Sequence, residues 1–190
     1  MKWDDGVCEL DKAELKMMLT FASSDLCRLN LTQVHFDPGR AEVVACDGHT
    51  LLLCKTIGKS DKLAFGVDCD ALDSVRAAMK AKDRLLIGWH ADGDRLVLSC
   101  TALPSPVEIK PYGHEPPPYR EIIPEWTEQL RELPPLGFDT EYLARLPMVQ
   151  KTIGAPGMRC LLDEDELGPS MFKCAADGVD ATVVIMPMRV

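Results

Sequence analysis

The chain has 190 residues, of which 46% are hydrophobic and 27% are charged, and its formal net charge is -9. This composition, with a mean hydropathy of -0.05, is that of a globular protein and excludes a disordered, collagen-like or membrane-spanning chain. The acidic balance also excludes a surface that binds polyanions everywhere. Any contact with nucleic acid therefore requires a local basic face.

The sequence begins with acidic residues at positions 4 and 5, where a signal peptide would have a positive region and an apolar run. We therefore expect a cytoplasmic protein that has no membrane partner. An even number of cysteines would suggest disulfides in a secreted chain, but no pair has C-x-x-C spacing and most lie in apolar runs. We expect reduced, buried thiols, with a disulfide or metal role as the alternative, for Cys8, Cys27, Cys46, Cys54, Cys69, Cys100, Cys160 and Cys174.

A weak repeat of an apolar strand, an aspartate, a helix and several short strands occurs three times. The first copy has a strand at 7–10, then Asp11, with Glu14 three residues later as in a capping box. Apolar residues follow at i, i+3, i+4 and i+7 from Leu15, which predicts an amphipathic helix.

The second copy has a strand at 63–67, then Asp68 and a helix with Leu72, Val75 and Met79 on one face. Asp70 and Asp73 fall in the first turn of this predicted helix. Carboxylates there favour the positive end of the helix dipole, so we do not interpret them as a catalytic pair.

The third copy has a strand at 136–138, then Asp139 and a helix that includes Leu143 and Leu146. Pro147 is expected to kink or end this helix, because proline removes a backbone donor in a helix interior.

Strand-like runs follow each helix and are separated by turn residues. Asp-Gly pairs favour the left-handed backbone that tight hairpin turns require. We therefore expect hairpins formed by 33–36 and 41–46 around Asp37-Pro38-Gly39, by 84–90, 95–100 and 107–112 with a turn at Asp92-Gly93, and by 158–162, 171–175 and 181–186 with a turn at Asp177-Gly178.

The predicted fold class is α+β, with helices on one side and antiparallel sheets on the other. Residues 113–135 contain six prolines, which prevent a continuous helix or sheet and mark a connection between domains. We assign 1–112 to a domain of two units and 136–190 to a half domain of one unit. Two units can bury their apolar faces against each other, but the third is left unpaired, so it packs either on another chain or within its own.

Signatures of catalysis are absent from the sequence: there is no G-x-S-x-G, Walker A, G-x-G-x-x-G or H-E-x-x-H motif. The acidic run 163–166 lacks the spacing of a calcium loop and reads as a solvated hairpin tip. We expect no enzyme activity, metal or cofactor, and a metal-dependent enzyme is a distant alternative. The histidines that such a site would have to gather are His35, His49, His90 and His114.

Three segments carry a resemblance to a known family. They are A-C-D-G-H-T-L at 45–51, Y-R-E-I-I-P at 119–124 and V-V-I-M-P-M-R-V at 183–190. They resemble the A-T-D-G-H-R-L segment, the domain junction P-D-Y-R-x-[VI]-[IL]-P and the terminal M-P-M-R-[LV] of the bacterial sliding clamp, the β subunit of DNA polymerase III. The resemblance runs over residues 6–190.

The resemblance implies a DNA-clamp fold and a processivity factor without covalent chemistry. Identical subunits of that family close into a homo-oligomeric ring around duplex DNA, with helices facing the DNA and sheets outside. A hydrophobic pocket tethers DNA polymerase or repair proteins through a short linear motif, and a clamp-loader ATPase is a further possible partner. By resemblance the pocket residues here are Leu31, Cys46, Gly48, His49, Thr50, Leu51, Pro117, Ile122, Val184, Met186, Pro187, Met188 and Arg189. The alternative is that Met186 and Met188 only end a core strand.

The chain departs from the family pattern in its number of units and in its pocket rim. It matches the middle domain and the second half of the last domain, so it has three units where a clamp subunit has six. If a ring still needs twelve units, four chains would close it. Thr50 replaces an arginine and Glu121 stands where a basic residue is common, so we expect altered peptide preference.

Threading onto DNA would need cations on the outward faces of the helices, to neutralise phosphates without reading sequence. A solvated surface is the alternative for these residues. A protein of another class also fits: a clamp-derived adaptor that binds the same peptide motifs and closes no ring. The DNA-facing candidates are Lys12, Lys16, Arg76, Lys80, Lys82, Arg84, Arg145 and Lys151.

Overall fold

The computed structural model describes residues 1–4, 7–58, 63–90, 93–111, 116–123, 137–162 and 168–188. None of the helices in these ranges is long and apolar enough to cross a membrane. Several predicted features lie outside the described residues: Asp92 of the second hairpin turn, the acidic run 163–166, most of the connection 113–135, His114 and Arg189.

The first two units share the order strand, helix and three strands, and the first unit has the additional short strand β1 at its start. The first has β1 (Lys2–Asp4), β2 (Val7–Asp11), α1 (Lys12–Phe21), β3 (Gln33–Asp37), β4 (Glu42–Cys46) and β5 (Thr50–Lys55). The second has β6 (Phe65–Asp68), α2 (Cys69–Ala78), β7 (Arg84–Trp89), β8 (Leu96–Cys100) and β9 (Val107–Ile109). The predicted strands and helices of both units are confirmed, with boundaries shifted by one to three residues.

The first two units exchange the strands that precede their helices. The strand β2 of the first unit pairs with β7, in the five-stranded sheet β1-β2-β7-β8-β9. The strand β6 of the second unit pairs with β3, in the seven-stranded sheet β10-β11-β12-β5-β4-β3-β6. Each helix therefore leads from one sheet to the other, and α1 and α2 pack together between them.

The third unit contains α4 (Thr140–Leu143), α5 (Leu146–Ile153), β10 (Arg159–Leu161), β11 (Ser170–Ala176) and β12 (Val179–Ile185). Its last strand, β12, pairs antiparallel with β5 over six residue pairs from Asp180↔Lys55 to Ile185↔Thr50. The third unit thus packs within its own chain, last strand against last strand. We call this β5–β12 pairing the seam.

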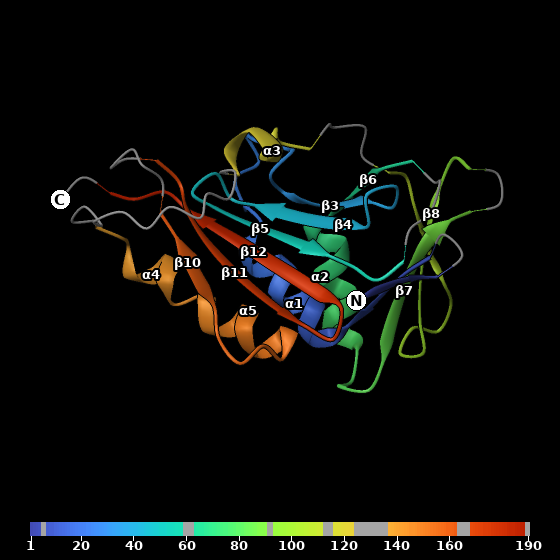
Figure 1. The fold of residues 1–190 in the computed structure, drawn as a ribbon. Helices are drawn as coiled ribbons and strands as arrows, with labels where there is room; N and C mark the ends of the chain where they lie inside the picture. Colours follow the sequence, from blue (N-terminus) through green and yellow to red (C-terminus); the bar gives the residue numbers. More distant parts are fainter. Residues whose placement is uncertain are drawn as a thin grey trace.

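The seven-stranded sheet separates two layers. Figure 1 shows α1, α2 and α5 along one face and the short helix α3 (Tyr119–Ile122) beyond the other face. We call the first the inner face and the second the outer face. This arrangement confirms the predicted α+β class, with helices on one side and antiparallel sheets on the other.

An aspartate begins the helical segment of every unit, as the repeat predicts. Asp11 accepts from the backbone N–H groups of Ala13 and Glu14, and Glu14 completes the capping box. The side chains of Asp68 and Asp139 cap α2 and α4 in the same way. These caps satisfy N–H groups that have no partner inside a helix.

The prediction of one kinked or shortened helix in the third unit is wrong. The segment forms two helices, α4 and α5, and Pro147 lies in the first turn of α5. Proline is favoured in a first turn because its missing N–H would have no helical partner there. Proline thus begins the second helix here, and Gly154 ends it in the left-handed conformation at φ 77°.

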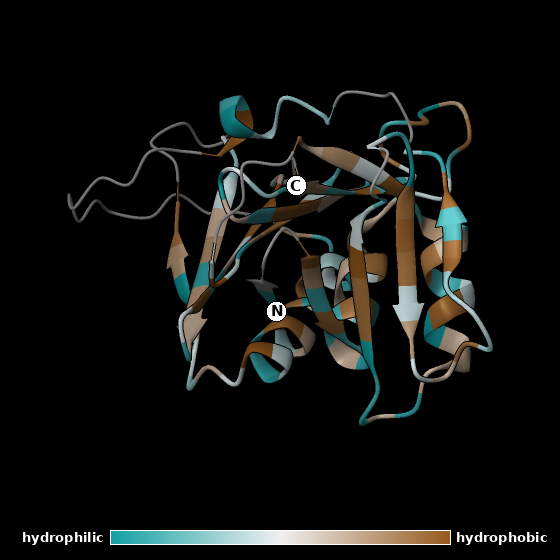
Figure 2. Cartoon of the chain, turned by 90° about the vertical axis from the view of Figure 1, so that its right-hand side faces the viewer, coloured by the Kyte–Doolittle hydropathy of each residue, from teal (hydrophilic) through white to brown (hydrophobic). Residues whose placement is uncertain are grey.

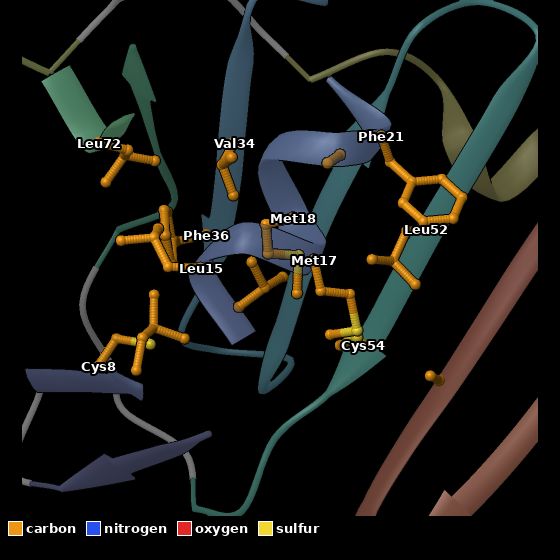
Figure 3. Packing of buried hydrophobic residues seen from close by; sticks show 14 of the residues in the cluster. Cys8, Leu15, Met17, Met18, Phe21, Val34, Phe36, Leu52, Cys54 and Leu72 are labelled. Atoms are coloured by element: carbon orange, nitrogen blue, oxygen red, sulfur yellow. The ribbon is translucent and has the colours of Figure 1, made fainter. Parts of the chain in front are cut away.

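The helix α1 is buried on a wider face than its single predicted stripe. Leu15 and Met18 of that stripe are fully buried, but so are Met17 and Phe21. Figure 3 shows Phe21 and Met17 directed toward Leu52 and Cys54 of β5, with Leu15 and Met18 on the side of Phe36. The helix α1 also packs on α5 of the third unit, so it has neighbours on more than one side, which a pattern within one helix cannot show.

Hydrophilic residues gather in the turns, while the strands are mostly hydrophobic (Figure 2). The predicted turn between β11 and β12 is confirmed, since Asp177 and Gly178 have φ of 51° and 79°. All eight cysteines are free thiols, as expected, but only four are buried. Cys27 and Cys160 are exposed, contrary to the prediction for them.

Candidate functional site

The outer face of the seven-stranded sheet carries an apolar row that crosses the seam. The strand registers place its members side by side from β4 to β10: Cys46, Leu51, Val184, Met171 and Leu161. Successive residues of a strand point to opposite faces, so this row lies opposite the main core. Two strands of the row come from the first unit and three from the third.

A second layer of side chains already packs on this apolar row. Leu31 and Tyr119 are buried against it, and Ile122 and Ile123 are partly buried there. Tyr119 begins α3, and its hydroxyl donates to Glu42 Oε2 over 3.1 Å. Arg120 donates to the same carboxylate oxygen. Glu42 thus fixes α3 over the outer face.

Glu42 is a buried carboxylate that accepts hydrogen bonds from one charged donor, Arg120, and one neutral donor, Tyr119. The Glu42 side chain is only 5% exposed, so it needs these partners. Burial, and then the neighbouring Glu42 carboxylate, raises the pKa of Tyr119 above its usual value. Tyr119 therefore remains a neutral donor at physiological pH.

The turn between β4 and β5 is held by the third unit. Arg145 Nη1 donates to Asp47 Oδ2 over 2.6 Å and to Thr50 Oγ1 over 2.7 Å. Its guanidinium also lies 5.1 Å from the ring centre of Tyr142 and 5.7 Å from that of Phe21. These contacts join helices of the first and third units at one end of the seam.

Asp47 is ionised within this turn. Burial would raise the pKa of its carboxyl, but hydrogen bonds from the Thr50 N–H, Arg145 and the His49 N–H outweigh burial and lower it. The positive φ of Gly48, 92°, lets the backbone turn beneath the side chain of Arg28. The motif residues Asp47 and Gly48 therefore shape the turn.

The chain leaves β12 along the same end of the seam. The Met186 N–H bonds the His49 carbonyl at 3.4 Å, and the Met188 N–H bonds the Gly137 carbonyl at 2.8 Å. Met186 is 41% exposed and Met188 is 49% exposed. The His49 ring stacks on Tyr142 at 5.7 Å between centroids. Exposed methionines thus lie beside a buried apolar floor.

The structure brings most of the predicted pocket residues to this end of the outer face. Cys46, Leu51 and Val184 form the floor, with Leu31 and Ile122 packed on it. The turn and the β12 exit contribute Gly48, His49, Met186, Pro187 and Met188, and buried Pro117 leads into α3. Thr50 differs, because it pairs with Ile185 of the main core and points to the inner face.

A cavity of about 860 Å³ opens on the outer face beside the apolar row. Leu53 and Ile123 contribute apolar walls. The charged residues that line it are Glu42, Lys55, Arg120, Arg159, Lys173 and Asp180, so cations outnumber carboxylates. The cavity therefore suits an apolar ligand that carries negative charge.

The predicted DNA-facing cations divide into two groups. Four already have partners within the chain. Lys12 donates to the Met79 carbonyl, Arg76 pairs with Asp73 at 2.7 Å, Arg84 pairs with Asp11 at 3.0 Å and Arg145 holds Asp47. The other four are exposed, and no ion pair joins them to another described residue: Lys16, Lys80, Lys82 and Lys151.

Several residues of this site were not predicted from the sequence. Glu42 is a charged residue within an apolar strand, which is a signal that sequence reasoning could have used. Met171 and Leu161 follow from strand alternation once the register is known. The partnership of Arg145 with Asp47 spans 98 residues and has no local signal.

No protein-family model and no curated protein matches the chain. Solved structures do match it along its whole length. The Caulobacter crescentus polymerase III β structure is 16% identical, with a TM-score of 0.70 and 69% of that chain covered. A Pseudomonas aeruginosa sliding clamp is 16% identical, with a TM-score of 0.66 and 68% of its chain covered. The Thermotoga maritima β subunit is 15% identical, with a TM-score of 0.58 and 67% covered.

These matches agree with the resemblance carried by the motifs at 45–51, 119–124 and 183–190. The similarity in fold extends over the full length of this chain. The chain therefore has the fold of the bacterial DNA polymerase III β sliding clamp, in a form that spans about 68% of such a clamp's length.

Proposed function

We propose that this protein is a compact sliding clamp: a non-enzymatic, homo-oligomeric ring on duplex DNA that tethers a DNA polymerase or repair protein through the outer face at the seam. The observation that carries the proposal is the division of the seven-stranded sheet into two surfaces. Helices whose exposed lysines form no ion pair with another described residue lie on the inner side, and the apolar row with its exposed methionines lies on the outer side.

The inner side supports contact with DNA through few cations. Lys16 on α1 and Lys151 on α5 are exposed and come from different units. Lys80 and Lys82 follow the end of α2. Sparse cations suit a ring that is held by topology, because such a ring needs to slide and does not need tight phosphate contacts.

The outer side supports binding of a short peptide. Exposed methionines adapt to varied apolar guests. Met186 and Met188 lie at one side of the buried row, and the basic cavity lies beside the row. A peptide with apolar residues followed by acidic ones would match this order of surfaces.

Topological trapping tests the ring without requiring a loader. Linear DNA is incubated with the protein and then circularised by ligase, and the mixture is washed at high salt to remove electrostatic contacts. We expect the protein to remain on the circle and to leave when a restriction enzyme cuts it. Equal loss from circular and linear DNA would contradict the ring.

A pair of charge-matched variants tests which side faces the DNA. The variant Lys16→Ala with Lys151→Ala removes two cations from the helices, and Lys55→Ala with Arg159→Ala removes two from the outer face. We expect only the first pair to weaken capture of DNA at low salt. If only the pair Lys55→Ala and Arg159→Ala weakened the capture of DNA, the DNA would lie on the outer face instead.

The peptide surface is tested with peptides selected from a random library on the wild-type protein. Met188→Glu should lower their affinity at least about tenfold, because a charge would replace an apolar contact. Ile57→Glu is the control, since Ile57 is 50% exposed and Met188 is 49% exposed. Equal losses of peptide affinity in Met188→Glu and Ile57→Glu would exclude the surface around Met188 as the peptide site.

Peptide binding without trapping on circular DNA would favour the second candidate, an adaptor that binds clamp motifs. The observation in its favour is the acidic character of the α2 surface. Asp70 and Asp73 are both exposed there, and Asp73 neutralises the nearby Arg76.

A further inference from the structure

The strand β9 forms the free edge of the five-stranded sheet. It pairs with β8 through Leu96↔Ile109, Val97↔Glu108 and Leu98↔Val107, and no other strand of the described chain pairs with its far side. As the last strand of the second unit, β9 corresponds to β5, the last strand of the first. The strand β5 is paired across the seam by the last strand of the third unit.

The hydrogen-bonding phase of the sheet shows which groups β9 presents at its edge. The His90 N–H bonds the carbonyl of Arg95, its direct opposite, at 2.8 Å. Hydrogen-bonded and non-bonded pairs alternate along an antiparallel ladder, so the backbone groups of Arg95 and every second residue after it point toward β7. The backbone N–H and C=O groups of Leu96 and Leu98 therefore point toward β9. Their partners Val107 and Ile109 are therefore satisfied, while the N–H and C=O of Glu108 point outward.

The side chains at this edge are self-complementary under a two-fold axis. An axis at Ile109 places Glu108, which also pairs with Arg95 of its own chain, opposite Lys110 of a second copy, and Lys110 opposite Glu108. Opposite charges in cross-strand positions stabilise such pairs. The same register places Ile109 against Ile109 on the core side, which is the side of the buried Leu96.

Two further observations favour a second copy over solvent. Val107 is 39% exposed although it lies on the core side of the sheet, as Leu98 does. In the same register Val107 would meet Pro111 of the second copy. Pro106 and Pro111 flank the edge and restrict pairing to the residues between them, because proline lacks the N–H that a ladder needs.

We propose that β9 pairs antiparallel with β9 of a second copy of this chain, with the two-fold axis at Ile109. The pairing repeats, between chains, the last-strand contact that the seam makes within one chain. It rests on the self-association in the proposed function but is independent of DNA. The continuous sheet keeps the helices of both copies on one side.

The test is the solution mass from light scattering across a concentration series, for two variants at one position. Both Glu108→Pro and Glu108→Ala lose the ion pair with Arg95 and the proposed pair with Lys110 of the second copy, but only Glu108→Pro loses the outward N–H. We expect a wild-type mass of two or four chains, the same mass for Glu108→Ala and half that mass for Glu108→Pro. Circular dichroism checks that both variants are folded.

A cross-linking variant provides an independent measurement. In the proposed register the Ile109 pair is not hydrogen-bonded, so its Cα atoms lie about 4.5 Å apart, within the range of a disulfide. Ile109→Cys should form a covalent dimer on mild oxidation. The wild type, with its exposed Cys27 and Cys160, is the control for background cross-links.

The outcomes separate the inference from the proposed function. A wild-type monomer at all concentrations would overturn both the β9 pairing and the ring. A wild-type oligomer whose mass is unchanged in Glu108→Pro, with no covalent dimer from Ile109→Cys, would overturn the β9 pairing and leave the ring to other surfaces.

Discussion

The two sheets of this protein are built alike but end differently. Each contains three successive strands of one unit and the strand that precedes the helix of the other, and β1 adds a further strand to the five-stranded sheet beside β2. Only the seven-stranded sheet is extended beyond the last strand of its unit, by six residue pairs at the seam. The five-stranded sheet stops at the three residues of β9. The difference teaches that the last strand of a unit is an edge on which a strand of another unit can pair. The first two units offer two such edges, β5 and β9, and the third unit pairs only with β5.

The largest effect should come from the core beneath the seam. Leu52 is fully buried and pairs with Val183 across the seam. Leu52→Ala should lower the free energy of unfolding by about 3 kcal/mol, since the cavity would refill only in part. Urea unfolding measures this change.

The matched control for Leu52 lies on the five-stranded sheet. Leu86 is 40% exposed, so Leu86→Ala should change stability by less than about 0.5 kcal/mol. Similar losses in the two variants would show that the seam is no more tightly packed than the outer surface of the other sheet.

A smaller effect is expected at the polar end of the seam. Arg145→Met should cost about 2 kcal/mol, because it leaves Asp47 without its charged donor. The Arg145 and Asp47 side chains are 23% and 14% exposed, so solvent replaces this contact only in part. Thermal unfolding provides the measurement.

Arg76→Met is the control for Arg145. It breaks an ion pair with Asp73, whose side chain is 55% exposed, and should cost at most about 0.5 kcal/mol. If Arg145→Met lowered stability no more than Arg76→Met does, the ion pair between Arg145 and Asp47 would not be what joins the third unit to the first.

The turn that directs β12 back to the seam should have a smaller effect still. Gly178 has φ +79°, so Gly178→Ala should cost about 1 kcal/mol through backbone strain. Gly157→Ala is the control, since an added Cβ there meets nothing within 4 Å and no positive φ is required. Chemical denaturation should separate the two, and an unchanged midpoint for Gly178→Ala would contradict the strain.

The smallest effect is a dependence on acid. The pKa of Asp47 is lower in the folded protein, so its contribution is complete above the ordinary carboxyl value of 3.8 and is lost as the pH falls through the lowered pKa. As the pH is lowered from about 6 to about 3, the free energy of unfolding should therefore fall less in Asp47→Asn than in the wild type. If the free energies of unfolding of the two proteins changed in parallel with pH, the protonation of Asp47 would not be coupled to folding.

Local signals in the sequence predicted much of the fold, because caps and turns depend on neighbouring residues. Asp11 and Asp68 cap their helices, and Asp177 with Gly178 forms the expected turn. The orientation of Thr50 was also open to prediction, since it adjoins Leu51 in a strand and must point to the other face.

Other features have no local signal. Glu42 meets Tyr119 across 77 residues, and Phe21 of the first unit lies beneath the guanidinium of Arg145 in the third unit. Pro147 was misinterpreted because proline has opposite effects inside a helix and at its start. Only the packing of α5 decides between these two.

The antiparallel pairing of last strands has one more consequence. Such a contact relates its two sides by a half-turn about a line through the sheet. If the contact at β9 follows the same rule and the assembly encircles DNA as we propose, its two rims are identical, and a protein approaching from either direction along the duplex meets the same binding surfaces. Polarity on DNA would then have to be supplied by the partner, because the assembly itself would have none.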